Sequence, residues 1–291
     1  MEALHKLQLC DHPVTRSKVN PKTPTYQAPP GVRSWLRFPA LPVLVISASL
    51  LCFALGCSND DNEMLVFSAA SLRDALTPLA QTFNSEHNTN VQFSFGGSIT
   101  LSQQLIRGAP GDLFIAAGEE PMASLNEKGL LDPNHQRTFL TNELVLVVAG
   151  HKLDVLEPLA ETLMNSKRIA LADPHLAPAG QYARESLVNL GLWDELRPKI
   201  VFGGDVRNTL AYVETGSSDA GIVYRSDALT SDRVRIVQVI PQDLYSPITY
   251  PAAVIKGSGN RKTAVEFLVF LQEQVDAGQF QQFGFGIPNH P

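Results

Sequence analysis

This chain has few cysteines and no cluster of like charges. The 291 residues include three cysteines, and Cys10 and Cys52 precede the end of an N-terminal segment that we expect to be removed. Cys57 then stands alone, which excludes an internal disulfide and a Cys-based metal site. The sequence has no Lys/Arg run, and its formal net charge is -6. We expect no nucleic-acid partner, because phosphate backbones are held mainly by clustered cations.

Catalytic and metal-binding motifs of recognisable spacing are also missing. No H-E-x-x-H or comparable metal pattern occurs. The histidines are scattered, and His175 reads as a loop residue. Neither Ser71 nor Ser98 lies in the G-x-S-x-G elbow of a serine hydrolase. The sequence therefore predicts no enzyme, no cofactor and no directly ligated metal.

The first 57 residues differ from the rest. A basic, proline-containing stretch is followed by the uncharged apolar run Phe38–Gly56, which is typical of a secretory signal. A transmembrane anchor is the alternative, because a run of this length could just span a bilayer. The ending Ala54-Leu55-Gly56-Cys57 resembles a bacterial lipobox. We expect residues 1–56 to be a removed signal, with a lipidated Cys57 anchoring an extracytoplasmic protein to a bacterial membrane.

Downstream of residue 63, short apolar runs alternate with amphipathic stretches. Leu72, Leu76, Leu79 and Phe83 repeat with the 4-3-4 spacing of one helix face. Alternating strands and helices predict an α/β fold with mostly parallel sheets. One domain and two lobes both suit the length. The expected strands are 64–69, 91–95, 113–116, 144–148, 168–172, 220–223 and 234–239.

Small or hydroxyl residues stand where four of these strands give way to helices. Ser71 is placed as a helix N-cap. Ser98 opens the next helix after two glycines, which have no side chain and so let the backbone lie close to a neighbouring group. Pro178 sits near the first position of a third helix. Asp205 is a natural cap for a fourth, with Val206 in its first turn. Each turn alone predicts only a good cap.

Four such turns in one α/β chain favour a binding site. Helix N-termini present unpaired N–H groups and the positive end of the helix dipole, which suits an oxyanion. Open α/β sheets place ligands at the carboxyl ends of their strands, where these turns lie. An anion there would be held by hydroxyl and backbone N–H donors without a counter-charge.

Six segments, in order, resemble the periplasmic molybdate-binding proteins of ABC transporters, which are type II periplasmic solute-binding proteins. They span roughly Met64 to Pro288, and Phe283-Gly-Phe285 is similar to the closing motif of that family. Six motifs in one order are far more specific than any one of them. The segments are AASLRDAL (69–76), FGGSITLSQQL (95–105), GAPGDLFIAA (108–117), DPHLAPAGQYA (173–183), DVRNTLAYVETG (205–216) and GIVY (221–224).

The resemblance implies a two-lobed periplasmic-binding-protein fold, each lobe a mostly parallel sheet flanked by helices, with the ligand in the cleft. Residues 64–142 plus 247–291 would form the first lobe and residues 143–246 the second. Crossing strands would fall near 144–148 and 250–255. The ligand residues implied are Ser71, Ser98 and Tyr224 through hydroxyls, and Ala179 and Val206 through backbone N–H groups.

The function implied is capture of molybdate or tungstate for an ABC transporter permease, by a monomer anchored through its lipid. A binding protein for another tetrahedral oxyanion, such as sulfate or phosphate, is the runner-up. A hydrolase using Ser71 or Ser98 as nucleophile is the alternative from another class. The sequence does not separate molybdate from tungstate, because the two ions are nearly the same size.

Overall fold

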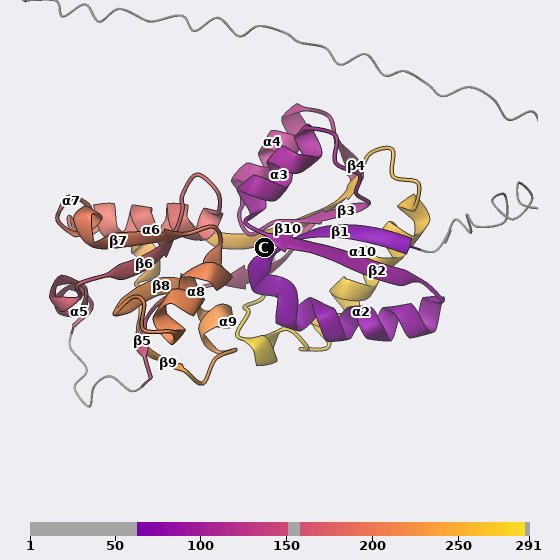
Figure 1. Ribbon diagram of the computed structural model, residues 1–291. Helices are drawn as coiled ribbons and strands as arrows, with labels where there is room; N and C mark the ends of the chain where they lie inside the picture. Colours follow the sequence, from indigo (N-terminus) through magenta and orange to yellow (C-terminus); the bar gives the residue numbers. More distant parts are fainter. Residues whose placement is uncertain (1–62, 151–157, 289–291) are drawn as a thin grey trace, which may run out of the picture. The chain divides into compact units, whose positions relative to one another are not determined.

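The computed structural model describes residues 63–150 and 158–288 of the chain. The expected signal segment 1–56 and Cys57 lie outside these ranges. Within them, no helix is both long and apolar enough to cross a membrane. The described residues form two five-stranded sheets, each with helices packed against it (Figure 1).

The first sheet has the strand order β2-β1-β3-β10-β4. Strand β1 runs parallel to β2 and β3, whereas β10 runs antiparallel to β3 and β4. Its strands are β1 (Glu63–Ala69), β2 (Asn90–Gly96), β3 (Leu113–Ile115), β4 (Leu131–Asn142) and β10 (Ile248–Ile255).

The second sheet has the strand order β7-β6-β8-β5-β9. Strand β6 runs parallel to β7 and β8, whereas β5 runs antiparallel to β8 and β9. Its strands are β5 (Leu144–Ala149), β6 (Ile169–Ala172), β7 (Ile200–Gly203), β8 (Ala220–Tyr224) and β9 (Val234–Val239).

Strand direction corrects one expectation. Half of the strand pairings in each sheet are antiparallel, so the sheets are mixed and not mostly parallel. The cause is the path of the chain. β5 and β10 are the strands that follow each passage from one sheet to the other, and both run antiparallel to their neighbours.

The helices follow the strands in chain order. Helices α2, α3 and α10 contact strands of the first sheet, and α6 and α8 contact strands of the second. The sequence predicted α2 from its apolar repeat, and the turns at Ser98, Pro178 and Asp205 predicted the starts of α3, α6 and α8. The helices are α2 (Arg73–His87), α3 (Ser98–Ile106), α4 (Glu119–Glu127), α5 (Leu159–Asn165), α6 (Pro178–Asn189), α7 (Trp193–Leu196), α8 (Val206–Glu214), α9 (Arg225–Ala228) and α10 (Arg261–Asp276), with short 3₁₀ turns such as η1 (Ala70–Leu72).

The chain passes between the sheets twice. It leaves β4 at Asn142 and enters β5 at Leu144, and it returns between β9 and β10 over residues 240–247. The expected crossings near 144–148 and 250–255 are instead strands inside the two sheets. The first passage comes one residue before the expected range and the second at least three residues before it, where the strand pairing breaks.

The centre of each sheet is apolar and buried. All six residues of β5 and all three of β3 are buried, as expected of strands covered on both faces. Burying each large aliphatic side chain contributes about 1.5–3 kcal/mol. This core fixes the carboxyl ends of β1, β2, β6, β7 and β8, which carry the turns described below.

Candidate functional site

All five residues expected to hold a ligand line one small cavity. It lies between the turns after β1 and β2 of the first sheet and those after β6, β7 and β8 of the second. Its volume is about 10 Å³, far below the ~300–1,000 Å³ of pockets for drug-sized molecules. The cavity therefore suits a small ion. The residues are Ser71, Ser98, Ala179, Val206 and Tyr224.

Ser71 reaches the cavity from the 3₁₀ turn η1. The expectation that it caps a helix is wrong, because α2 begins at Arg73 and no side-chain cap bond forms at either helix start. Instead, Oγ of Ser71 lies 3.0 Å from the hydroxyl of Tyr250, and both side chains are buried. The 3₁₀ turn directs the serine inward to this tyrosine.

Ser98 is the first residue of α3, as the sequence predicted, with Gly97 before it. Its side chain is fully buried, and its Oγ accepts a hydrogen bond of 3.0 Å from the backbone N–H of Ala117. Because that bond occupies a lone pair, the hydroxyl proton of Ser98 is left to donate to a ligand.

Two helix N-termini supply backbone donors. Ala179 follows Pro178 in the first turn of α6, and Val206 is the first residue of α8. The first N–H groups of a helix have no intrahelical acceptor. Asp205 also lines the cavity, but its Oδ1 accepts from the backbone N–H of Asn208 at 2.9 Å. Its carboxylate thus caps α8, as predicted.

Tyr224, the last residue of β8, brings a third hydroxyl to the cavity. Its side chain is 1% exposed and lines the cavity, yet its hydroxyl has no hydrogen-bond partner among the described residues. Burial raises the pKa of Tyr224 well above its ordinary value, so the hydroxyl keeps its proton. A buried hydroxyl without a partner costs free energy, and an anion in the cavity would satisfy it.

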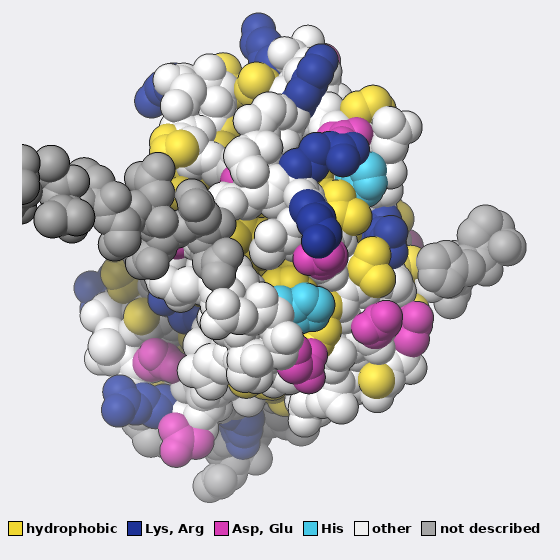
Figure 2. Space-filling model, turned by 90° about the vertical axis from the view of Figure 1, so that its right-hand side faces the viewer, with side chains coloured by type: hydrophobic (Ala, Val, Ile, Leu, Met, Phe, Trp, Pro, Cys, Tyr) yellow, Lys and Arg dark blue, Asp and Glu magenta, His cyan; other side chains and the backbone are white. Residues whose placement is uncertain are grey.

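The cavity lacks a cation. No Lys, Arg or His lines it. On the face seen in Figure 2, Lys and Arg side chains lie interspersed with Asp and Glu and form no continuous basic surface. Without residues 1–56 the chain has 17 Lys and Arg against 27 Asp and Glu, a net charge of -10. Attraction of an anion must therefore be local, through hydrogen bonds and helix dipoles.

Backbone contacts join the two sides of the cleft. The N–H of Thr100 in α3 donates to the carbonyl oxygen of Leu176, before α6, at 3.1 Å. Gly97 lies against the same carbonyl, because a Cβ placed there would be 2.5 Å from it and 3.1 Å from the carbonyl oxygen of Gly204. Only glycine allows the backbones of the two lobes to approach so closely.

An ion pair also bridges the cleft. Arg207 of α8 pairs with Asp74 of α2, and its Nε lies 2.6 Å from Oδ1 of Asp227. Asp227 is fully buried, and burial raises its pKa to about 7 although the Arg207 guanidinium opposes the shift. Asp227 thus holds Arg207 in the second lobe, from which the guanidinium reaches the first.

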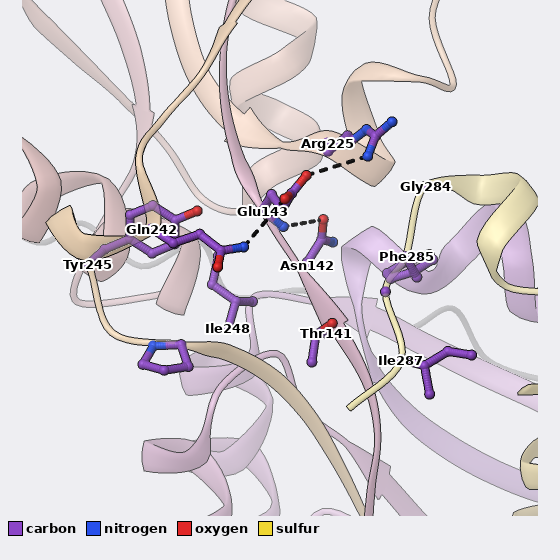
Figure 3. A pocket seen from close by; sticks show the side chains of 12 residues that line it. Thr141, Asn142, Glu143, Arg225, Gln242, Tyr245, Ile248, Gly284, Phe285 and Ile287 are labelled. Carbon is purple, nitrogen blue, oxygen red and sulfur yellow. Dashed lines mark hydrogen bonds and ion pairs between the residues drawn. The ribbon is translucent and has the colours of Figure 1, made fainter. Parts of the chain in front are cut away.

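A larger hollow lies where the chain passes between the sheets (Figure 3). The carboxylate of Glu143 is paired with two other side chains that line it. Glu143 accepts hydrogen bonds from Arg225 at 3.4 Å and from Gln242 at 3.3 Å. The hollow has no buried donor without a partner to compare with Tyr224, so we assign the site to the smaller cavity.

Two residues that sequence reasoning missed lie directly behind the site. Tyr250 of β10 contacts Ser71, and Asn142 at the end of β4 donates to Tyr250 at 3.0 Å. Both are buried. Asn142 could have been noticed as a polar residue at the end of a strand, but many such residues lie elsewhere in the chain, and Tyr250 lies inside its strand.

The amino-acid sequence is similar to those of two bacterial proteins over most of their lengths. YvgL of Bacillus subtilis, provisionally named an ABC transporter substrate-binding lipoprotein, is 38% identical over 252 residues, which cover 83% of this chain and 96% of YvgL. The molybdate-binding protein ModA of Escherichia coli is 36% identical over 264 residues, 88% of this chain and 99% of ModA.

Solved structures agree on the fold. The periplasmic molybdate-binding protein of Azotobacter vinelandii matches with a TM-score of 0.70, covering 78% of this chain and all of that protein, at 23% identity. This similarity shows the two-lobed fold. Residues 64–286 match the family described as bacterial extracellular solute-binding protein, which is a family of binding proteins and not of enzymes. The chain therefore belongs to the bacterial extracellular solute-binding protein family.

Proposed function

We propose that this protein captures molybdate or tungstate outside the cytoplasm and delivers it to the permease of an ABC transporter. One observation carries the proposal: hydrogen-bond donors from both lobes converge, without a cation, on one small cavity. Molybdate and tungstate are fully ionised tetrahedral dianions at neutral pH. They need donors only, and every one of the five residues supplies one.

The relatives support this anion over others. ModA of Escherichia coli is named for molybdate and aligns along nearly its whole length. Sulfate has the same charge and shape but is smaller. We infer that rigid donors reject it, because they lie too far apart to close on it. Both lobes contribute donors, so an anion would favour the closed arrangement that a permease recognises.

The remaining parts of the proposal concern the whole chain. We propose lobes of residues 64–142 plus 247–291 and of residues 143–246, a removed signal at 1–56, a lipid on Cys57 and a monomeric state. The sheet membership of the strands supports these lobe boundaries. The name of YvgL, a lipoprotein, supports the anchor.

Calorimetric titration tests the anion. The full chain, purified in detergent, is titrated with molybdate, tungstate, sulfate and phosphate. We expect tight, one-to-one binding of molybdate and tungstate, and binding of sulfate and phosphate that is weaker by at least about 100-fold. Equal affinities for sulfate and molybdate would contradict the size argument, and no heat with any of the four would contradict the function.

A further inference from the structure

A chain of buried hydrogen bonds runs from the passage between the lobes to the cavity. It begins at Asn142, the last residue of β4, and passes through Tyr250 to Ser71. All three side chains are at most 5% exposed. Only Ser71 lines the cavity, so the other two could act on a ligand only through it.

The amide of Asn142 has one allowed orientation. The backbone N–H of Glu143 points at one end of the amide, 2.9 Å away (Figure 3). An N–H group can only donate, so that end must be the oxygen. The amide nitrogen therefore faces the Oγ of Ser226 at 2.8 Å and the hydroxyl of Tyr250 at 3.0 Å. Both of its protons are used.

This orientation fixes the direction of the next bond. The Tyr250 hydroxyl accepts from Asn142, and its own proton has the Oγ of Ser71 as its partner at 3.0 Å. Burial raises the pKa of Tyr250 above its ordinary value, so the proton stays on the hydroxyl. Ser71 must then accept from Tyr250. Its own proton is left to point into the cavity, where a fully ionised anion needs donors only.

We propose that Asn142 and Tyr250 are positioning residues that set Ser71 as a hydrogen-bond donor before the anion arrives. The inference rests on the function proposed above. Ser226, which anchors Asn142, lies on α9 of the second lobe, whereas Ser71 and Tyr250 belong to elements of the first. The donor is thus oriented by a contact that spans the two lobes.

A double-mutant cycle on the full chain tests the relay, with molybdate affinity measured by calorimetry. Without its partner the Ser71 hydroxyl can rotate, so Tyr250→Phe should weaken binding about three- to tenfold. In a Ser71→Ala background, Tyr250→Phe should cause no further loss, because Tyr250 acts only through Ser71. Tyr245→Phe is the matched control. Tyr245 is also buried and bonds the backbone N–H of Leu144, so its loss should leave affinity unchanged.

Asn142→Asp provides a second, independent variant. A carboxylate oxygen in place of the amide nitrogen would accept the Tyr250 proton, and Ser71 would then donate to Tyr250 and turn a lone pair to the anion. Binding should weaken more than in Tyr250→Phe, and adding Tyr250→Phe to Asn142→Asp should recover part of the loss. A loss that persists in that pair would mean that the new charge acts directly, and the relay would be wrong.

The outcomes separate the relay from the site. The same loss from Tyr250→Phe in both backgrounds, or no loss in either, would overturn the relay while the proposed function stands. Full affinity in Ser71→Ala would instead overturn the site on which the relay depends.

Discussion

The three hydroxyls of the cavity occupy different environments. Ser71 and Ser98 each have a buried partner, Tyr250 and the N–H of Ala117 respectively. Tyr224 has none among the described residues. A partnered hydroxyl is already oriented when the ligand arrives. A buried hydroxyl without a partner gains more from a ligand, because its desolvation cost is already present in the folded protein.

Tyr224→Phe should therefore have opposite effects on stability and on binding. Removing an unpartnered buried hydroxyl should leave the free energy of unfolding of the ligand-free protein unchanged or raise it by up to about 1 kcal/mol. Losing a bond to a charged ligand should cost about 1.5–3 kcal/mol, a fall in molybdate affinity of about 10- to 150-fold.

Denaturant unfolding and calorimetry on the same samples measure both effects. Tyr212→Phe, outside the cavity on α8, is the control and should leave affinity unchanged. A Tyr224→Phe protein that loses stability without losing affinity would show that the hydroxyl is structural.

The five ligand residues were predicted as a set by the resemblance to a known family, and the four strand-to-helix turns supported all of them except Tyr224, which ends a strand. Ser98 and Val206 open helices, and that can be predicted from neighbours in the sequence. The relay could not be predicted. Tyr250 lies 179 residues from Ser71 and 108 from Asn142, so only the folded sheet brings them together. The 3₁₀ turn that redirects Ser71 from its expected capping role was also missed.

At the scale of elements, the first turns of α3 and α6 approach each other across the cleft. Thr100 bonds the carbonyl of Leu176, and Gly97 leaves room for that carbonyl. A methyl group at residue 97 would keep the two backbones apart. The hydrogen-bond donors on α6 and α8 would then lie farther from those on α3 and η1.

Gly97→Ala should weaken molybdate binding by about 5- to 150-fold, the equivalent of a packing clash of ~1–3 kcal/mol. Small-angle scattering should show that the variant with ligand stays more open than the parent protein. Gly204→Ala is the control, because no atom lies within 4 Å of a Cβ placed there. If Gly97→Ala binds molybdate as tightly as the parent, closure does not depend on this contact.

The ion pair between α8 and α2 should make a smaller contribution. The Asp74 side chain is 43% exposed, and exposed pairs contribute about 0–1 kcal/mol. Asp74→Asn should lower affinity by at most about fivefold and reduce the loss of affinity caused by added salt. Titrations at several salt concentrations measure this. Glu266→Gln removes the exposed Lys262–Glu266 pair of α10 as a control. An unchanged salt dependence in Asp74→Asn would contradict the bridge.

The elements were predicted unevenly. Apolar runs located β1, β5 and β8 to within a residue or two, because buried strands read as continuous apolar segments. β4 was missed, because its sequence from Leu131 to Asn142 alternates weakly and carries several polar residues. Strand direction was also missed, since no local pattern reports that β5 and β10 follow a passage between sheets.

At the scale of the whole molecule, the chain without residues 1–56 would pair a net charge of -10 with the proposed anionic ligand. A negatively charged protein does not attract an anion over a long distance. An anchor that keeps the protein near the permease would therefore help it deliver the bound anion. We expect Cys57→Ala to move the protein from the detergent phase to the aqueous phase in detergent partitioning, because the lipid would be lost. Cys52→Ala, within the expected signal, should leave partitioning unchanged. If both variants stay in the detergent phase, a lipid on Cys57 is not the anchor.

The position of the bound anion tests the central claim most directly. Crystals grown with tungstate and measured for anomalous scattering should show one strong peak in the cavity, within hydrogen-bond reach of Ser71, Ser98, Tyr224 and the backbone N–H groups of Ala179 and Val206. A tungstate peak elsewhere in the molecule, with this cavity empty, would contradict the account.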